Sequence, residues 1–262
     1  MINLNAVDVS YDVKGGKKAL ESINLNVDGD KVVVIGSNGS GKTTLIKVIL
    51  GLVNALNGEV LLNGKNVRNI SGETGVSTNL SDVYRLINVT VYDIISLYSK
   101  LKGCKPDEPL NLISEFDLKD ILAKRIYQLS SGEQKMVGNI LALSFSPRTV
   151  LLDEPFDNID QGRRIRLIRH IKALDSEVLM NTHELDLLSK LSNWKMCFII
   201  EGKLYGKYDL SMLDSLYITP GEESGNLGVI KTSFGIYSVT FGRGKVKISS
   251  APSLNSLLDG VE

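Results

Sequence analysis

The sequence predicts an α/β protein whose core contains a mixed sheet, with an inserted helical subdomain and a small β-rich appendage near the C-terminal end. Short, strongly apolar runs typical of buried strands occur at residues 32–35, 150–153 and 177–183. A helix-length segment, RRIRLIRHIKAL, separates the last two runs, so parallel strands are expected in the core. We expect this organisation: core at residues 1–82 and 146–207, helical subdomain at 83–145 and appendage at 208–262.

The composition is that of an ordinary globular protein, with 262 residues, 43% of them hydrophobic and 23% charged. Lysine plus arginine and aspartate plus glutamate number 30 each, so no excess of positive charge favours a nucleic-acid partner. The two cysteines, Cys104 and Cys197, have no metal-type spacing and favour a reducing compartment. The chain lacks the pattern of a secretory signal or a membrane helix. We therefore expect a cytoplasmic protein.

The first third of the chain predicts antiparallel strands. Residues 2–35 alternate between strand-like stretches and polar or glycine-containing turns, which favours an antiparallel layer. Residues 58–62 resemble another strand, and it ends at Asn63-Gly64, the strongest short signal for a β-hairpin.

Residues 32–44 read VVVIGSNGSGKTT and predict a phosphate-binding loop. A buried strand would lead into a glycine-rich turn whose successive N–H groups point at one anion. The apolar stripe at residues 45–49 predicts a helix that ends near Gly51, and the N-terminus of this helix would favour phosphate. The alternative is a surface turn that binds nothing, but the strand, the motif and the helix together favour a phosphate-binding loop.

The spacing Gly36-x4-Gly41-Lys42-Thr43 is that of a P-loop. We expect Lys42 to contact the β and γ phosphates of a bound nucleotide and the Thr43 hydroxyl to ligate Mg2+. The predicted cradle consists of Gly36, Ser37, Asn38, Gly39, Ser40, Gly41, Lys42, Thr43 and Thr44.

Helical signals dominate residues 83–145, and strand signals return in the appendage. Thr90 and Asp93 form an acidic variant of a capping box, and Ile94, Tyr98 and Leu101 are expected on one helix face. Residues 233–250 alternate apolar and polar side chains around Gly-Arg-Gly, which predicts a β-hairpin. The appendage is either an extra sheet covering part of the core or a regulatory or partner-binding element.

The buried strand at residues 150–152 ends at Asp153 and Glu154. Ligands bind at the C-terminal ends of strands in parallel sheets, so an acidic pair here suits hydrolysis of a nucleotide bound at the P-loop. Asp153 suits the Mg2+ shell, and Glu154 suits the role of general base toward the attacking water. A solvated acidic turn is the alternative, which the P-loop elsewhere in the chain makes weaker.

Residues 129–134, LSSGEQ, predict a helix start capped by Ser130 or Ser131, with its N-terminus toward a phosphate. At this point the sequence resembles the ATP-binding cassette (ABC) ATPases, with their P-loop NTPase core, over residues 2–207. Their LSGGQ signature is matched by Leu129, Ser130, Gly132 and, as a variant, Glu133.

The resemblance implies roles for three further positions. Tyr11 aligns with the aromatic residue that stacks on adenine, residues 156–160 with the D-loop that ends at Asp160, and His183 with the switch histidine that contacts the γ phosphate. Without the resemblance, Tyr11 would be read as a packing residue and His183 as an ordinary polar residue at a strand end.

The chain departs from the family pattern at several positions. Asn79 replaces the usual glutamine that senses the γ phosphate, and the shorter side chain is expected to lengthen its contact with Mg2+ or water. Ser131 replaces the middle glycine of the signature, where a Cβ could crowd the partner's nucleotide. Met136 and Leu141 occupy positions that are often basic in relatives.

The resemblance implies an ATPase that works as a head-to-tail pair with a second ABC subunit and drives a separate integral membrane permease. Each ATP would lie between the P-loop of one chain and the Ser130 segment of the other, on the cytoplasmic face of the membrane. Substrate, direction of transport and homo- or heterodimer are left open. One alternative is a soluble ABC ATPase that acts in cofactor assembly or regulation without transport, and another is a nucleotide-sensing binding module.

Overall fold

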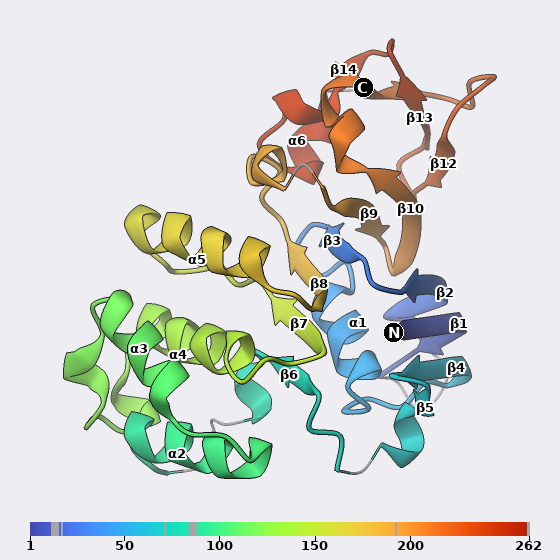
Figure 1. The fold of residues 1–262 in the computed structure, drawn as a ribbon. Coiled ribbons are helices and arrows are strands. Elements are labelled where there is room, and N and C mark those ends of the chain that lie inside the picture. Colours follow the sequence, from blue (N-terminus) through green and yellow to red (C-terminus); the bar gives the residue numbers. More distant parts are fainter. Residues whose placement is uncertain (12–15, 17, 71, 84–87, 192, 261–262) are drawn as a thin grey trace. The chain divides into compact units, whose positions relative to one another are not determined.

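The computed structural model describes residues 1–11, 16, 18–70, 72–83, 88–191 and 193–260 (Figure 1). The chain divides into two compact units. Unit 1 consists of Met1–Ile70 and Asn181–Glu262, and unit 2 consists of Ser71–Met180. Both contain strands and helices, which confirms the predicted α/β class. The predicted domain limits stay a prediction.

Unit 1 contains an antiparallel sheet with the strand order β2-β1-β4-β5. Its strands are β1 (Ile2–Val9), β2 (Leu20–Val27), β4 (Asn57–Leu62) and β5 (Lys65–Asn66). Neighbouring strands all pair antiparallel, as the sequence predicts. Asn63 and Gly64 have φ angles of 52° and 78°, the left-handed conformation that a two-residue hairpin turn of type I′ requires.

A second sheet in unit 1 has the order β10-β9-β3, with the last residues of β8 (Glu177–Thr182) beside β3. β3 (Lys31–Ile35) runs parallel to β9 (Lys195–Ile200), which pairs antiparallel with β10 (Lys203–Asp209). Residues 32–35 are completely buried, which confirms the strand predicted before the P-loop. β3 therefore lies in this sheet and not in the antiparallel layer.

The helix predicted after the P-loop is α1 (Lys42–Ile49), and it buries its apolar stripe. It ends at Ile49 with Leu50 as its C-cap, and Gly51 then takes the left-handed conformation with φ 69°, so the predicted stop is confirmed.

The described residues of unit 2 form four α-helices and part of a sheet with the order β8-β7-β6. Its strands besides β8 are β6 (Val76–Thr78) and β7 (Thr149–Asp153), which run parallel. The helices are α2 (Val91–Lys102), α3 (Asp107–Glu115), α4 (Ser131–Leu143) and α5 (Gln161–Ala173). Residues 88–145 are thus mainly helical, as expected, while residues 84–87 of the predicted helical subdomain lie outside the described residues.

The capping box of Thr90 and Asp93 begins α2 as predicted. The predicted apolar face was wrong in part, because Leu101 is 63% exposed although Ile94 is completely buried. The buried face of α2 includes Ile95 and Ser99, so it lies about one residue further round the helix than predicted. This is the face that packs against α4.

The basic residues of α5 hold the end of α3. Arg163 donates from Nε to the carbonyl oxygen of Phe116 at 3.0 Å, and Arg166 donates to that of Glu115 and to the Asp117 carboxylate. His170 and Glu115 lie 2.8 Å apart. Because the last carbonyl groups of a helix lack partners within it, these contacts stabilise the C-terminus of α3.

The C-terminal part of unit 1 forms a sheet with the order β12-β13-β11-β14, followed by α6 (Leu254–Asp259). Its strands are β11 (Leu216–Pro220), β12 (Gly228–Lys231), β13 (Ile236–Phe241) and β14 (Val246–Lys247). The β-rich appendage is confirmed. The hairpin predicted for residues 233–250 was wrong, because β11 lies between β13 and β14 and pairs with both.

Short 3-10 helices connect these elements at Val67–Asn69, Ser81–Val83, Lys119–Ile121, Ile126–Gln128, Leu188–Lys190, Leu210–Ser215 and Ile248–Ser250. Among the described residues, every helix is too short or too polar to cross a lipid bilayer.

Candidate nucleotide site

The P-loop of unit 1 is closed around the side chain of Lys42. This residue begins α1 and is 6% exposed, and its Nζ donates hydrogen bonds to the carbonyl oxygens of Gly36 at 2.8 Å and Ser37 at 3.0 Å. Gly41 has a φ angle of 108°, and a Cβ built on Gly36 would lie 2.4 Å from Ser40 Oγ. The loop therefore adopts this conformation only because glycine stands at these positions, and a buried ammonium at the start of a helix suits phosphate.

Tyr11 lies beside the end of this loop. Its hydroxyl and Thr44 Oγ1 are 3.2 Å apart, while the residue is 63% exposed. The hydrogen bond of its hydroxyl holds the Tyr11 ring near the P-loop, and the face of the ring is left open for stacking with a planar base.

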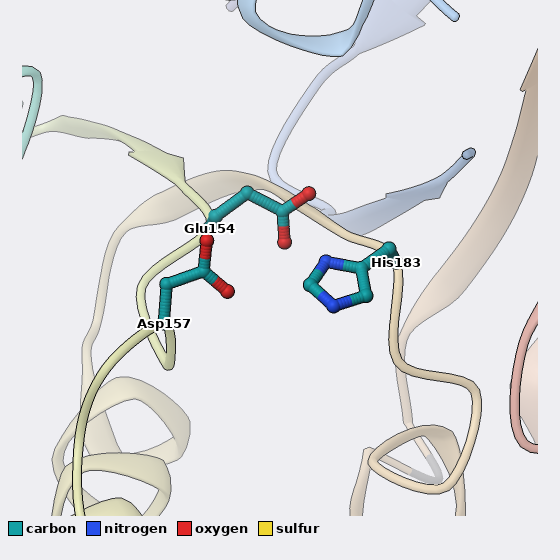
Figure 2. Close-up of side chains that lie close together, drawn as sticks. All are labelled: Glu154, Asp157 and His183. Atoms are coloured by element: carbon teal, nitrogen blue, oxygen red, sulfur yellow. The ribbon is translucent and has the colours of Figure 1, made fainter. Parts of the chain in front are cut away.

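The acidic turn of unit 2 follows β7. Glu154 has a φ angle of 43°, in the left-handed region, and its carbonyl oxygen accepts a hydrogen bond from the Asp157 N–H at 3.2 Å. Carboxylate oxygens of Glu154 and Asp157 lie within 4.8 Å of each other. Figure 2 shows both side chains on this turn, and His183 on the segment of unit 1 that follows β8.

Asn79 follows β6 and is buried against the end of β7. β6 and β7 pair in parallel register up to Thr78 and Leu151, so the residues just beyond the two strands are neighbours. Asn79 Oδ1 accepts the Asp153 N–H at 2.7 Å, and Asn79 Nδ2 donates to the Asp153 carbonyl oxygen at 3.2 Å. The contact predicted between Asn79 and Mg2+ stays a prediction. It requires the carboxamide to give up its hydrogen bonds with the main chain of Asp153 and to bind the ion instead.

Two residues of α4 that sequence reasoning missed complete this contact. Asn139 is completely buried and accepts a hydrogen bond from Asn79 Nδ2 at 2.8 Å, and it donates to the Pro155 carbonyl oxygen at 2.7 Å. Lys135 Nζ donates to the Asp153 carbonyl oxygen at 2.9 Å. A signal for Asn139 was present in the sequence, because an amide stands inside the otherwise apolar run of residues 136–143.

The signature segment begins α4 with the predicted cap. Ser130 accepts from the Glu133 N–H at 3.2 Å, and the Glu133 carboxylate accepts from the Ser130 N–H at 2.7 Å. The Ser130 N–H is the main cause that lowers the pKa of Glu133, and an ion pair with Lys124 at 3.1 Å acts in the same direction. A Cβ on Gly132 would lie 2.3 Å from the carbonyl oxygen of Asn158, so this turn of α4 and the D-loop are in close contact.

Asp160 caps the N-terminus of α5. Its carboxylate accepts the Arg163 N–H at 3.0 Å, and this bond is the main cause that lowers the pKa of Asp160. Asp160 thus has a structural role as the N-cap of α5, and the nucleotide contact implied by the resemblance stays a prediction.

The segment after His183 is joined to the C-terminal part of unit 1. The Leu185 N–H donates to the Pro252 carbonyl oxygen at 3.1 Å, and Glu184 and Ser253 form an isolated antiparallel bridge. Leu185 is 2% exposed and Leu257 of α6 is completely buried. The appendage therefore fixes the main chain immediately after the histidine.

Comparisons with known proteins identify the family of this chain. The family model for "ABC transporter" matches residues 20–157, more than half of the chain. A provisionally named ABC transporter ATP-binding protein of Methanocaldococcus jannaschii is 34% identical over 245 residues, which cover 83% of this chain and 85% of that protein. The taurine import ATP-binding protein TauB of Escherichia coli is 33% identical over 185 residues, 67% of this chain and 72% of TauB.

Among solved structures, the crystal structure of a protein provisionally described as a cobalt transport ATP-binding protein is similar with a TM-score of 0.91 and 38% identity, and the match covers 100% of both chains. The chain therefore belongs to the family of ABC transporter ATP-binding proteins. It is an ATP-binding ATPase of the kind that powers a transporter, as the sequence predicts.

Proposed function

We propose that the P-loop of this chain and the signature segment of a second ABC subunit hold one ATP between them, and that Glu154 activates the water that attacks the γ phosphate. The observation that supports this most strongly is the ammonium of Lys42, buried inside a glycine-rich loop where a Cβ on Gly36 or Gly41 would collide with the surrounding chain. A buried cation in a glycine-rich loop that begins a helix favours a polyphosphate.

Each predicted residue has a definite part in this proposal. Tyr11 stacks on the adenine, and residues 36–44 surround the phosphates, with Lys42 neutralising their charge. His183 donates a hydrogen bond to the γ phosphate. The partner subunit's copies of Ser130, Gly132, Glu133 and Asp160 complete the site from the other side.

Thr43 and Asp153 offer a hydroxyl and a carboxylate oxygen, the hard ligands that suit Mg2+. When bound, Mg2+ would neutralise charge that develops on the phosphate oxygens. Glu154 accepts the proton of the water as the bond between oxygen and γ phosphorus forms, and ADP leaves with the electron pair of the broken bond.

The test is Mg2+-dependent ATP hydrolysis by the purified full chain, compared with Glu154→Gln. We expect this variant to bind ATP with unchanged affinity, to lose turnover by at least about 100-fold, and to accumulate as an ATP-bound dimer in size-exclusion chromatography. Turnover equal to that of the unchanged chain would contradict the assignment of the base.

We further propose an integral membrane permease as the partner that receives the mechanical output, with the chain bound at the cytoplasmic face of the membrane through its helical segment at residues 83–145. The family membership supports this assignment. Copurification of the tagged chain from membranes with a multi-span protein is the expected result. A stable complex made of soluble partners alone would contradict it and favour the role without transport.

A further inference from the structure

We propose that Asn79 and Asn139 form a buried amide pair that fixes the main chain on both sides of Glu154, which makes Asn139 a positioning residue for ATP hydrolysis. This inference rests on the proposed role of Glu154 as general base. The pair, Lys135 and the acidic turn all belong to unit 2.

Four hydrogen bonds connect Asn79, Asn139 and Lys135 to the main chain of the two residues beside Glu154. Before it, the Asp153 N–H donates to Asn79 Oδ1 at 2.7 Å, and the Asp153 carbonyl oxygen accepts from Asn79 Nδ2 at 3.2 Å and from Lys135 Nζ at 2.9 Å. After it, the Pro155 carbonyl oxygen accepts from Asn139 Nδ2 at 2.7 Å. Glu154 is thus held at both neighbouring residues.

The conformation of Glu154 explains why such support is needed. Its φ angle of 43° lies in the left-handed region, which a residue with a side chain adopts at a cost. Such a conformation persists when surrounding contacts determine it, and strained residues of this kind are typical of active sites. The direction of the Glu154 side chain therefore depends on the main chain of Asp153 and Pro155, which the amide pair holds.

The bonds between the two amides make the pair a single unit. Asn79 Nδ2 donates one proton to Asn139 Oδ1 at 2.8 Å and the other to Asp153. Turning either carboxamide by 180° would place like groups against each other, so the partners fix both orientations. With Asn79 2% exposed and Asn139 completely buried, water does not replace a lost bond easily.

The first test is Asn139→Leu in the full chain, because leucine keeps similar volume and removes both hydrogen-bonding groups. We expect kcat for ATP hydrolysis to fall about 10-fold to 100-fold while KM for ATP changes by less than about twofold, since the P-loop is untouched. Ser144→Ala is the matched control. Ser144 is also completely buried at the end of α4, but its hydroxyl donates to the Ile140 carbonyl oxygen and not to the acidic turn. A kcat for Asn139→Leu equal to that of the control would overturn the proposal.

The second test repeats Asn139→Leu in the Glu154→Gln background. If Asn139 acts through Glu154, the residual turnover does not fall further, whereas an equal fold-loss in both backgrounds overturns the proposal. The same pair of variants separates the two hypotheses. Full turnover by Glu154→Gln contradicts the proposed base, while an inactive Glu154→Gln beside a fully active Asn139→Leu contradicts the positioning role alone.

A third variant keeps the proposal falsifiable if leucine prevents folding. In Asn139→Asp the introduced carboxylate still accepts from Asn79, but it donates to Pro155 only when protonated. We expect its kcat, relative to the unchanged chain at the same pH, to rise as the pH falls from about 8 to 6, because burial raises the pKa of a carboxyl. A ratio that is constant or falls over this range overturns the proposal.

Discussion

The side-chain oxygen of Asn79 accepts the backbone N–H of Asp153 at 2.7 Å, and its side-chain nitrogen donates to the carbonyl oxygen of the same residue at 3.2 Å. The carboxamide thus pairs with the N–H and the carbonyl oxygen of Asp153 in the way that the backbone of a residue in a neighbouring strand would. One side chain extends the contact between β6 and β7 beyond the end of β6.

Asn79→Gln should destabilise the chain, although glutamine is the usual residue of the family here. The additional methylene does not fit a site that is 2% exposed, and it displaces the amide from both atoms of Asp153. We expect a loss of about 1–3 kcal/mol in the free energy of unfolding, measured by urea denaturation. Asn54→Gln, at an exposed position, is the control with an expected change below about 0.5 kcal/mol. Equal stability of both variants would contradict the fit described for Asn79.

Lys42→Ala should weaken ATP binding. The variant removes the buried ammonium, and because hydrogen bonds to charged groups contribute about 1.5–3 kcal/mol, the Kd should rise about 10-fold to 100-fold. Titration with a fluorescent ATP analogue measures this change. Lys100→Ala, on the exposed side of α2, should bind as the unchanged chain does. An unchanged Kd for Lys42→Ala would show that the P-loop is not the phosphate site.

Asp8 should make the stability of unit 1 depend on pH. Its carboxylate accepts from Lys18 at 2.8 Å, the Ser22 N–H at 2.8 Å and Asn57 at 3.1 Å. These bonds, that of Lys18 foremost, lower the pKa of Asp8 from 3.8 to about 2. Because the folded state favours the ionised form, the stabilisation is present above about pH 4 and is lost as the pH falls toward 2.

The variant Asp8→Asn isolates this effect. At pH 7 we expect it to be less stable than the unchanged chain by about 2 kcal/mol, and at pH 3 by about half as much. Urea denaturation at several pH values measures the difference. Asp28→Asn, at an exposed position, should show no such trend. A difference that stays constant from pH 7 to pH 3 would contradict the lowered pKa.

Gly132→Ala should disturb the contact between α4 and the D-loop. Its Cβ would lie 2.3 Å from the Asn158 carbonyl oxygen, and main chain has to move to accommodate it. We expect a net loss of about 1–3 kcal/mol in the free energy of unfolding, despite the higher helix propensity of alanine. The neighbouring Ser131→Ala is the control, because that residue is exposed and already has a Cβ. A Gly132→Ala variant as stable as this control would show that the close contact is easily relieved.

Features set by short segments could be predicted from the sequence. The P-loop, the Asn63-Gly64 turn and the capping box of Thr90 depend on a few adjacent residues, and their geometry follows from backbone sterics and local hydrogen bonds. The signature segment likewise begins a helix at the residue expected, with Ser130 as its cap.

Features that depend on distant partners could not be predicted. β14 pairs with β11 and not with β13, because strand pairing is decided by packing across the sheet rather than by the turn alone. Asn139 is identified as part of the candidate site only when its two partners, Asn79 and Pro155, are known. Arg163 and Arg166 of α5 donate to carbonyl groups at the end of α3, which lie far away in the sequence, so no local pattern indicates these acceptors.

The bond from the Leu185 N–H to the Pro252 carbonyl oxygen has a consequence for the order of folding during synthesis. The segment after His183 leaves the ribosome long before Pro252 does, so for that interval it lacks its partner. A nascent chain that already contains the whole P-loop and the acidic turn thus still lacks this contact beside His183. The main chain after His183 acquires the contact only once the appendage has been synthesised.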